Sequence, residues 1–420
     1  MNGQWQLRDA MPTHAHCIST SIGATDMSAR VRAALFAPVP LVLVFALLAA
    51  RVAWIAAVPD IDMDAYGHYG IGCELIRNPW NLAAHWVWLP LYHYLLAAVV
   101  LARGVFAHVR LLSAALIGAL PLVLYRYEMS RDARNERVAP LAAVCCALAS
   151  IVNVLGISAQ QEALFSMLVL LSAWAIDAER PVLSGWSLAL ACLIRYEAWG
   201  AAGVCLAQPI LVHALVRLER APREGTWAHV LFGRPLSFAV SLPAIAVMLG
   251  WVLVHRAVDG TWFAFLRALY EYTHAQREVL SHGAVVDLLW FPLLLPLFAF
   301  GPALLVVPFG VRTALRPGYI VPLGILAFLL LSYAGKGSLG GSRYYGAITP
   351  FLCACMAHGV LRLVRGEAAR TLLRASVIAS LSVTTAIAFV RLEKTASAQA
   401  EVLHAAERRM VCERDTVSSR

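Results

Sequence analysis

Long apolar blocks constrain the fold of this chain more than any other feature of its sequence. One of the first reads LVLVFALLAARVAWIAAV (41–58), and blocks of similar character recur to about residue 390. A helix of about 20 apolar residues crosses the roughly 30 Å hydrocarbon core of a bilayer. The chain is 60% hydrophobic and only 14% charged, a balance that soluble domains rarely show. The sequence therefore predicts an all-α polytopic membrane protein.

The apolar blocks predict about eleven transmembrane helices. They lie at about 34–57, 110–127, 138–156, 161–177, 181–195, 198–217, 235–256, 287–311, 318–333, 345–363 and 372–390. A further block at 89–103 is short and follows several aromatic residues, which suit the headgroup region. We expect it to lie along the membrane interface, as part of an outer first loop that carries juxtamembrane helices. The alternative is a twelve-span chain in which 126–137 faces outward.

Short arginine-rich loops set the orientation, because such loops stay on the cytoplasmic side. They are 126–137, 217–234, 311–317 and 362–370, and Arg30 and Arg32 precede the first span. The loop after the first span is then outside the inner, or plasma, membrane. The net charge of +9 is carried largely in these loops, so it does not indicate nucleic-acid binding.

The chain divides into one membrane domain with two polar ends. Residues 1–29 lack the apolar core of a signal peptide, and we expect them to be disordered. Met27 begins a stretch that suits the start of a membrane protein. We therefore expect translation to begin at Met27, so that residues 1–26 would not be translated. The membrane domain covers 30–390, and a polar tail follows at 391–420.

Three carboxylates stand directly after the first span, in PDIDMDAYGHY (59–69). Asp60, Asp62 and Asp64 repel one another unless a cation lies between them or one of them is protonated. Solvated loop acids would explain them, but their place at the outer membrane surface favours a functional role. Whether Asp60 and Asp62 hold a divalent cation such as Mg or Mn is left open.

The predicted outer surface also collects cations and further acids. Arg343 and Lys336 oppose the positive-inside trend, and a lipid phosphate would explain them. We predict a substrate site that also includes Tyr344, Arg195, Glu197, Glu162 and His93. Arg195 and Glu197 could instead form a structural ion pair, and Glu162 could be a first-turn acid that interacts with its helix dipole.

Five short segments resemble the GT-C superfamily of membrane glycosyltransferases, in particular family-39-like and mannosyltransferase-like enzymes. They are PDIDMDAY, HWVWLPLYHYLLA, SAQQEALF, LIRYEAW and GSRYYGAITPFL. The resemblance implies an inverting transferase that uses a polyprenyl-phosphate sugar donor on the outer, periplasmic face. It implies that Asp62 or Asp64 is the catalytic base and that Arg343 meets the donor phosphate. Asp60 would be an assisting acid.

Two departures from the family pattern bear on the catalytic base and on the substrate. The usual Asp-Glu pair reads Asp64-Ala65, which leaves the choice of base open. The Lys-Pro-Pro of some relatives reads Trp88-Leu89-Pro90, so a cation that those relatives place near the donor phosphate is missing, which argues against an aminoarabinose-type substrate. The acceptor, whether glycan, lipid or protein, is not specified by the sequence. The alternative function is a multi-pass transporter or lipid flippase, in which charges would lie near the bilayer midplane.

Overall fold

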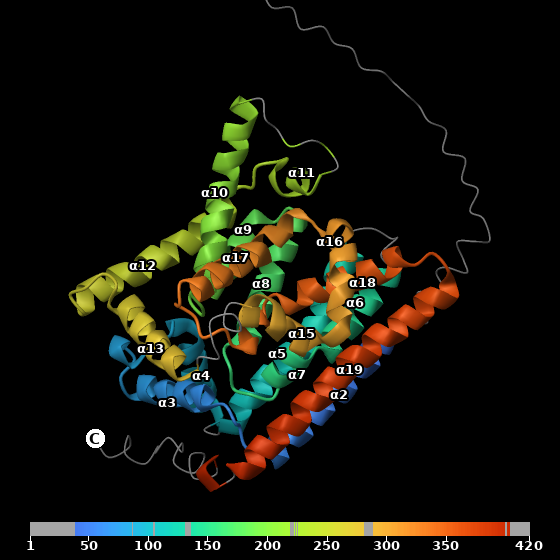
Figure 1. Cartoon of the computed structure of the whole chain (residues 1–420). Helices are drawn as coiled ribbons and strands as arrows, with labels where there is room; N and C mark the ends of the chain where they lie inside the picture. The colour runs from blue at the N-terminus through green and yellow to red at the C-terminus, as the bar shows by residue number, and fades with distance from the viewer. Residues whose placement is uncertain are drawn as a thin grey trace, which may run out of the picture.

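The computed structural model describes residues 38–85, 87–103, 106–130, 136–218, 222, 224, 226–280, 289–399 and 401–403. These residues form a helical bundle, and no strand occurs among them (Figure 1). The predicted disorder of 1–29 and the proposed start at Met27 fall outside the described residues. The last helix continues to Ala398, past the predicted boundary of the membrane domain at 390.

Nine of the predicted spans coincide with single helices. These are α2 (Pro38–Ala57), α5 (Phe106–Met129), α8 (Glu162–Asp177), α9 (Pro181–Cys192), α10 (Glu197–Arg217), α12 (Leu242–Val258), α17 (Ile320–Ala334), α18 (Thr349–Leu363) and α19 (Glu367–Ala398). The predicted span 138–156 is broken into α6 (Val138–Leu148) and α7 (Ser150–Leu155). The span 287–311 consists of η4 (Trp290–Leu294), α15 (Leu295–Phe300), η5 (Gly301–Val306) and α16 (Val307–Ala314).

Six helices or continuous helical runs of the described chain are long and apolar enough to cross a membrane. Several other apolar helices, α9 and α12 among them, are shorter. The chain is therefore a multi-pass membrane protein, as its sequence predicts. The count of eleven spans stays a prediction.

A buried arginine holds the first helix against the break between α6 and α7. The Asn153 side chain donates to the carbonyl oxygens of Ala147 (2.8 Å) and Ala149 (3.0 Å), on either side of the break. Arg51 of α2 donates to the Asn153 side chain at 2.9 Å and is itself 2% exposed. This contact brings the end of α2 beside the end of α7.

Small residues allow close packing of α16 on α18. A Cβ atom on Gly310 would lie 1.8 Å from the carbonyl oxygen of Cys355. A Cβ on Gly359 would lie 2.3 Å from the carbonyl oxygen of Val306. Backbones in direct contact are typical of helix pairs in membranes, where van der Waals packing holds helices together.

The juxtamembrane helices α3 (Met63–Arg77) and α4 (Pro90–Arg103) lie side by side at one end of the bundle, beside α13 (Ala264–Leu280) (Figure 1). At the start of α4, the Leu91 N–H donates to the carbonyl of Leu193 (3.0 Å), at the end of α9. Just after α4, Phe106 stacks on Tyr66 of α3 with 4.9 Å between ring centroids. Both ends of α4 thus lie at the same end of the bundle, which agrees with the prediction that 89–103 does not cross the membrane.

The arginine-rich loops meet at the opposite end of the bundle. Arg316 and Glu128 form a buried ion pair at 2.6 Å, and the Gly318 N–H donates to Asp177 at 2.8 Å. Arg137, before α6, pairs with Glu367, the first residue of α19, at 3.0 Å. The loops that the sequence assigns to one side of the membrane are therefore together in the fold.

Cysteine labelling tests the sidedness of these two ends. Ser130 and Asn78 are exposed at opposite ends of the bundle, whereas the six free cysteines in the described chain are buried. We expect Asn78→Cys to react with a membrane-impermeant maleimide in intact cells, and Ser130→Cys to react only after permeabilisation, because the arginine-rich end stays in the cytoplasm. External labelling of Ser130→Cys would support the twelve-span arrangement.

Candidate functional site

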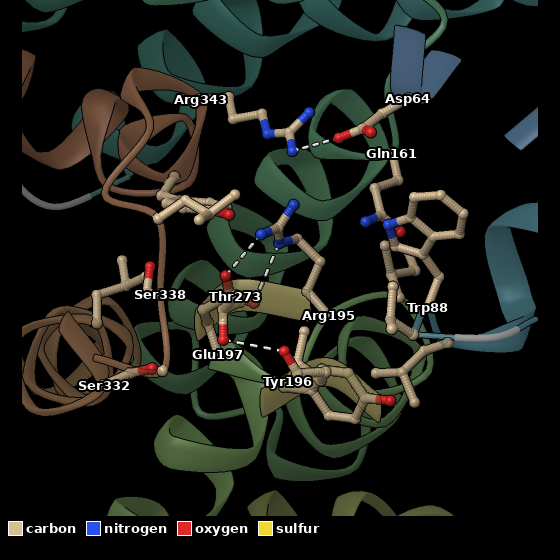
Figure 2. Close-up of a pocket in the computed structure, with 18 of the residues that line it drawn as sticks. Asp64, Trp88, Gln161, Arg195, Tyr196, Glu197, Thr273, Ser332, Ser338 and Arg343 are labelled. Carbon is tan, nitrogen blue, oxygen red and sulfur yellow. Dashed lines mark hydrogen bonds and ion pairs between the residues drawn. The ribbon is translucent and has the colours of Figure 1, made fainter. Parts of the chain in front are cut away.

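Four loops and α13 enclose an open cavity at the end of the bundle that carries α3. One loop leads into α4, and the others connect α7 to α8, α9 to α10, and α17 to α18. The cavity encloses about 810 Å³ including its open mouth. Six of the polar residues that line it are Asp64, Gln161, Arg195, Glu197, Arg343 and Tyr344 (Figure 2). Residues far apart in the sequence therefore meet in one place.

Asp60 joins the loop between α2 and α3 to the loop between α7 and α8 from within the protein. Its carboxylate accepts hydrogen bonds from the Ser158 hydroxyl (2.9 and 3.0 Å) and the Ala159 N–H (2.8 Å). It also accepts from the N–H of Asp62 (3.1 Å), and the Arg110 Nε atom lies 3.8 Å away. Only 2% of Asp60 is exposed, and it does not line the cavity. Its geometry therefore suits an anchor for the loop that carries Asp62.

Asp62 and Asp64 sit at the beginning of α3, and both face Arg343. Asp62 is the N-cap residue, since its Oδ1 atom accepts from the Asp64 N–H at 3.0 Å. The Oδ2 atom of Asp62 lies 3.5 Å from Arg343 Nη1 and that of Asp64 lies 2.5 Å from Arg343 Nη2. The exposed fractions of the Asp62 and Asp64 side chains are 33% and 23%. Asp64 lines the cavity, whereas Asp62 contacts the same arginine without lining the cavity itself.

Glu162 lies behind the cavity and connects the two arginines. Its Oε1 atom is an acceptor for Arg195 Nη1 and lies 3.5 Å from Arg343 Nε. Arg195 also donates to both oxygens of Glu197, at 2.6 and 3.0 Å, and its guanidinium lies 4.8 Å from the ring centroid of Tyr344. The predicted structural pairing of Arg195 with Glu197 is therefore present, and both residues also line the cavity.

The electrostatic surroundings make Asp62 an unusually basic carboxylate. Burial raises the pKa of Asp62 to about 6, and Asp64, Asp60 and Glu162 act in the same direction while Arg343 acts against them. Burial alone would lower the pKa of Arg343, but the neighbouring carboxylates outweigh it and raise that pKa. Arg343 therefore stays charged, whereas Asp62 changes protonation state near neutral pH.

His93 belongs to a buried row of three imidazoles behind the cavity wall. Its Nε2 atom lies 2.8 Å from His68 Nδ1, and its Nδ1 atom lies 2.8 Å from His85 Nδ1. Burial lowers the pKa of each of the three, to about 4 for His85. His68 lines the cavity, whereas His93 does not. The structure thus places His93 behind His68, and its predicted role in substrate binding stays a prediction.

Lys336 and a divalent cation, the other predicted parts of the site, have less support in the structure. Lys336 is exposed after α17, with φ +61°, and does not line the cavity. No group of three or more His, Cys, Asp or Glu in the described chain is arranged to hold a metal. The carboxylate of Asp60 already accepts hydrogen bonds from the Ser158 hydroxyl and the Ala159 N–H. A cation held by Asp60 and Asp62 therefore does not fit this arrangement. Binding of Mg or Mn stays a prediction.

The structure also adds residues that the sequence did not single out as site residues. Trp88, Tyr196, Tyr272 and the neighbouring pair Gln160 and Gln161 line the cavity. Trp88 and the glutamines lie in segments that carry the GT-C resemblance, HWVWLPLYHYLLA and SAQQEALF. Nothing in the spacing of these residues shows that they reach the same cavity as Asp64.

No family model and no curated protein matches this chain. Its fold is similar to that of ArnT from Cupriavidus metallidurans in the apo state, with a TM-score of 0.52 and 14% sequence identity over 91% of this chain and 78% of that chain. ArnT bound to undecaprenyl phosphate aligns with a TM-score of 0.49 and 14% identity, over 94% of this chain and 78% of that one. The predicted all-α membrane fold is confirmed, and it resembles that of ArnT.

Removal of the Asp60 carboxylate is expected to destabilise the folded protein. Asp60→Ala leaves Arg110 buried without its carboxylate partner, and we expect it to lower the free energy of unfolding by about 3 kcal/mol. Asp60→Asn keeps an acceptor for Ser158 and is expected to cost less. Thermal unfolding of the purified variants in detergent measures both. Equal losses in the two variants would contradict an ionic role for Asp60.

Proposed function

We propose that this chain is an integral membrane glycosyltransferase that moves a sugar from a polyprenyl-phosphate donor to an acceptor hydroxyl. The observation that carries the proposal is the pairing of Asp62 and Asp64 with Arg343, at an open cavity that Asp64 and Arg343 line. A carboxylate beside a guanidinium supplies the two groups that such a transfer needs, a base and a phosphate ligand. The ArnT-like fold supports the same class of enzyme.

In the proposed reaction, Asp62 removes the proton from the acceptor hydroxyl. The resulting oxygen attacks the anomeric carbon as the bond to the phosphate oxygen breaks, so the configuration at that carbon is inverted. Arg343 stabilises the negative charge that develops on the departing polyprenyl phosphate. The bilayer holds the lipid tail and so limits the positions that the donor can take.

Three observations favour Asp62 as the base. It is more exposed than Asp64, its Oδ2 atom is held less closely by Arg343, and its pKa is raised to about 6. Asp64 lies closer to Arg343 and would hold its guanidinium for the phosphate. Asp64 lines the cavity and is the alternative base.

We further propose that the cavity faces outward, on the periplasmic side of the inner membrane. The arginine-rich loops lie at the opposite end of the bundle, and such loops favour the cytoplasm. The donor phosphate would then be bound at the outer leaflet, next to Arg343.

The dependence of the rate on pH tests the base. The base must be ionised, so we expect kcat/KM to rise with pH up to about 6, the pKa of Asp62, and to level off above it. Asp62→Asn should lower kcat by roughly 10²–10⁴-fold. The assay measures release of undecaprenyl phosphate from its glycosylated form in the presence of a cell-envelope acceptor extract. If Asp64→Asn removes the pH-dependent rise and Asp62→Asn does not, the base is Asp64.

Substitution of Arg343 tests the phosphate ligand. We expect Arg343→Ala to weaken binding of undecaprenyl phosphate by about 10–100-fold, because a charge-assisted hydrogen bond is lost. Arg343→Lys keeps the charge but not the planar fork, so it should restore only part of the affinity. Unchanged binding by Arg343→Ala would remove the phosphate role. Movement of the lipid across vesicles without transfer of its sugar would instead favour a flippase.

A further inference from the structure

Two neighbouring glutamines in the cavity wall have polar atoms without partners. Gln160 is 1% exposed and Gln161 is 4% exposed, and both line the cavity. Both amide atoms of Gln160 and the Oε1 atom of Gln161 lack a hydrogen-bond partner within the part of the chain that the structure describes. A buried amide without partners is costly. The cost is recovered if a molecule in the cavity supplies the missing hydrogen bonds.

A buried glutamine elsewhere in the bundle has a hydrogen-bond partner for each of its amide atoms. Gln208 of α10 is 2% exposed. Its Nε2 atom donates to the carbonyls of Leu231 (2.7 Å) and Arg234 (2.8 Å), and its Oε1 atom accepts from the Leu236 N–H (2.8 Å). The two cavity glutamines differ from it in lacking such contacts, so a purely structural role does not account for them.

The chemistry of a carboxamide limits what the missing partner can be. The NH₂ group donates and the oxygen accepts, so a molecule that satisfies Gln160 must both accept and donate. A phosphodiester only accepts hydrogen bonds, whereas each sugar hydroxyl does both. This conclusion does not depend on how the Gln160 amide is oriented, because both of its atoms lack partners.

The surroundings of the glutamines also suit a neutral ring. Trp88 lies next to Gln161 at the side of the cavity that carries Asp64 (Figure 2). Aromatic side chains supply apolar contact area, and a few placed polar groups fix the orientation of a bound ligand. The neighbouring guanidinium of Arg195 is paired with Glu162 and with both carboxylate oxygens of Glu197.

We propose that Gln160 and Gln161 bind hydroxyl groups of the transferred sugar, while Trp88 packs against the sugar ring. This inference rests on the proposed function and extends it from the donor phosphate to the sugar. It divides the cavity into two parts, with Arg343 for the phosphate and the glutamines for the sugar.

Binding measurements with and without the sugar test this division. The probes are undecaprenyl phosphate alone and undecaprenyl phosphate that carries glucose, mannose or N-acetylglucosamine, with affinities measured by native mass spectrometry of the purified full-length chain. The unaltered chain should bind at least one glycosylated lipid about tenfold more tightly than undecaprenyl phosphate. Gln160→Leu with Gln161→Leu should remove that preference and leave the affinity for undecaprenyl phosphate unchanged.

Two further variants separate a binding role from a structural one. Gln208→Leu should lower the thermal unfolding temperature and keep the sugar preference, because its hydrogen bonds are structural. The double cavity variant should keep the unfolding temperature, because it loses no hydrogen bond within the protein. Arg343→Ala should weaken binding of both kinds of lipid.

The outcomes against the proposal are distinct. A sugar preference that survives in the double variant would overturn it, as would a fall in unfolding temperature like that of Gln208→Leu. An unaltered chain that binds undecaprenyl phosphate but prefers none of the glycosylated lipids would also overturn it, while the donor-phosphate role of Arg343 would stand. An unaltered chain that binds none of these lipids would overturn the proposed function itself.

Discussion

The buried carboxylate of Asp60 is the contact on which the site depends. Two protein N–H groups, a hydroxyl and the Arg110 guanidinium surround it. Burial raises the pKa of Asp60, and Arg110 and the hydrogen bonds act against that rise. Because Ser158 and Ala159 lie in the loop before α8 and Asp60 lies in the loop after α2, this carboxylate fixes one loop against the other. Asp62 follows two residues later and takes its position from that anchor.

A second layer of ion pairs then sets the charge of the cavity. Glu162 stands between Arg195 and Arg343, and its Oε1 atom serves both guanidiniums. Each arginine therefore has more than one carboxylate partner, and Arg343 also contacts Asp62 and Asp64. In surroundings of low dielectric constant such pairs keep their geometry, because breaking one leaves an unpaired buried charge. The site is thus largely formed before any ligand enters.

The helical core supplies the rigid frame for these loops. Arg51 and Asn153 join α2 to the break between α6 and α7, and the glycines of α16 and α18 allow their backbones to touch. At the far end, the pair of Arg316 and Glu128 closes the bundle. Polar residues inside a membrane bundle are costly unless paired, and here each of these pairs connects segments that are distant in the sequence.

The sequence alone determined the membrane class, the positions of most helices and the end of the bundle at which each loop lies, because apolar length and arginine placement are local properties. It also selected Asp64, Arg343, Arg195, Glu197 and Tyr344, which line one cavity, and Asp62, which lies beside Arg343. Only the tertiary structure decided that Asp60 is buried as an anchor, that His93 lies behind His68 and that Lys336 stands apart. The physical reason is that burial and partner choice depend on contacts between distant segments, which the residue pattern does not contain.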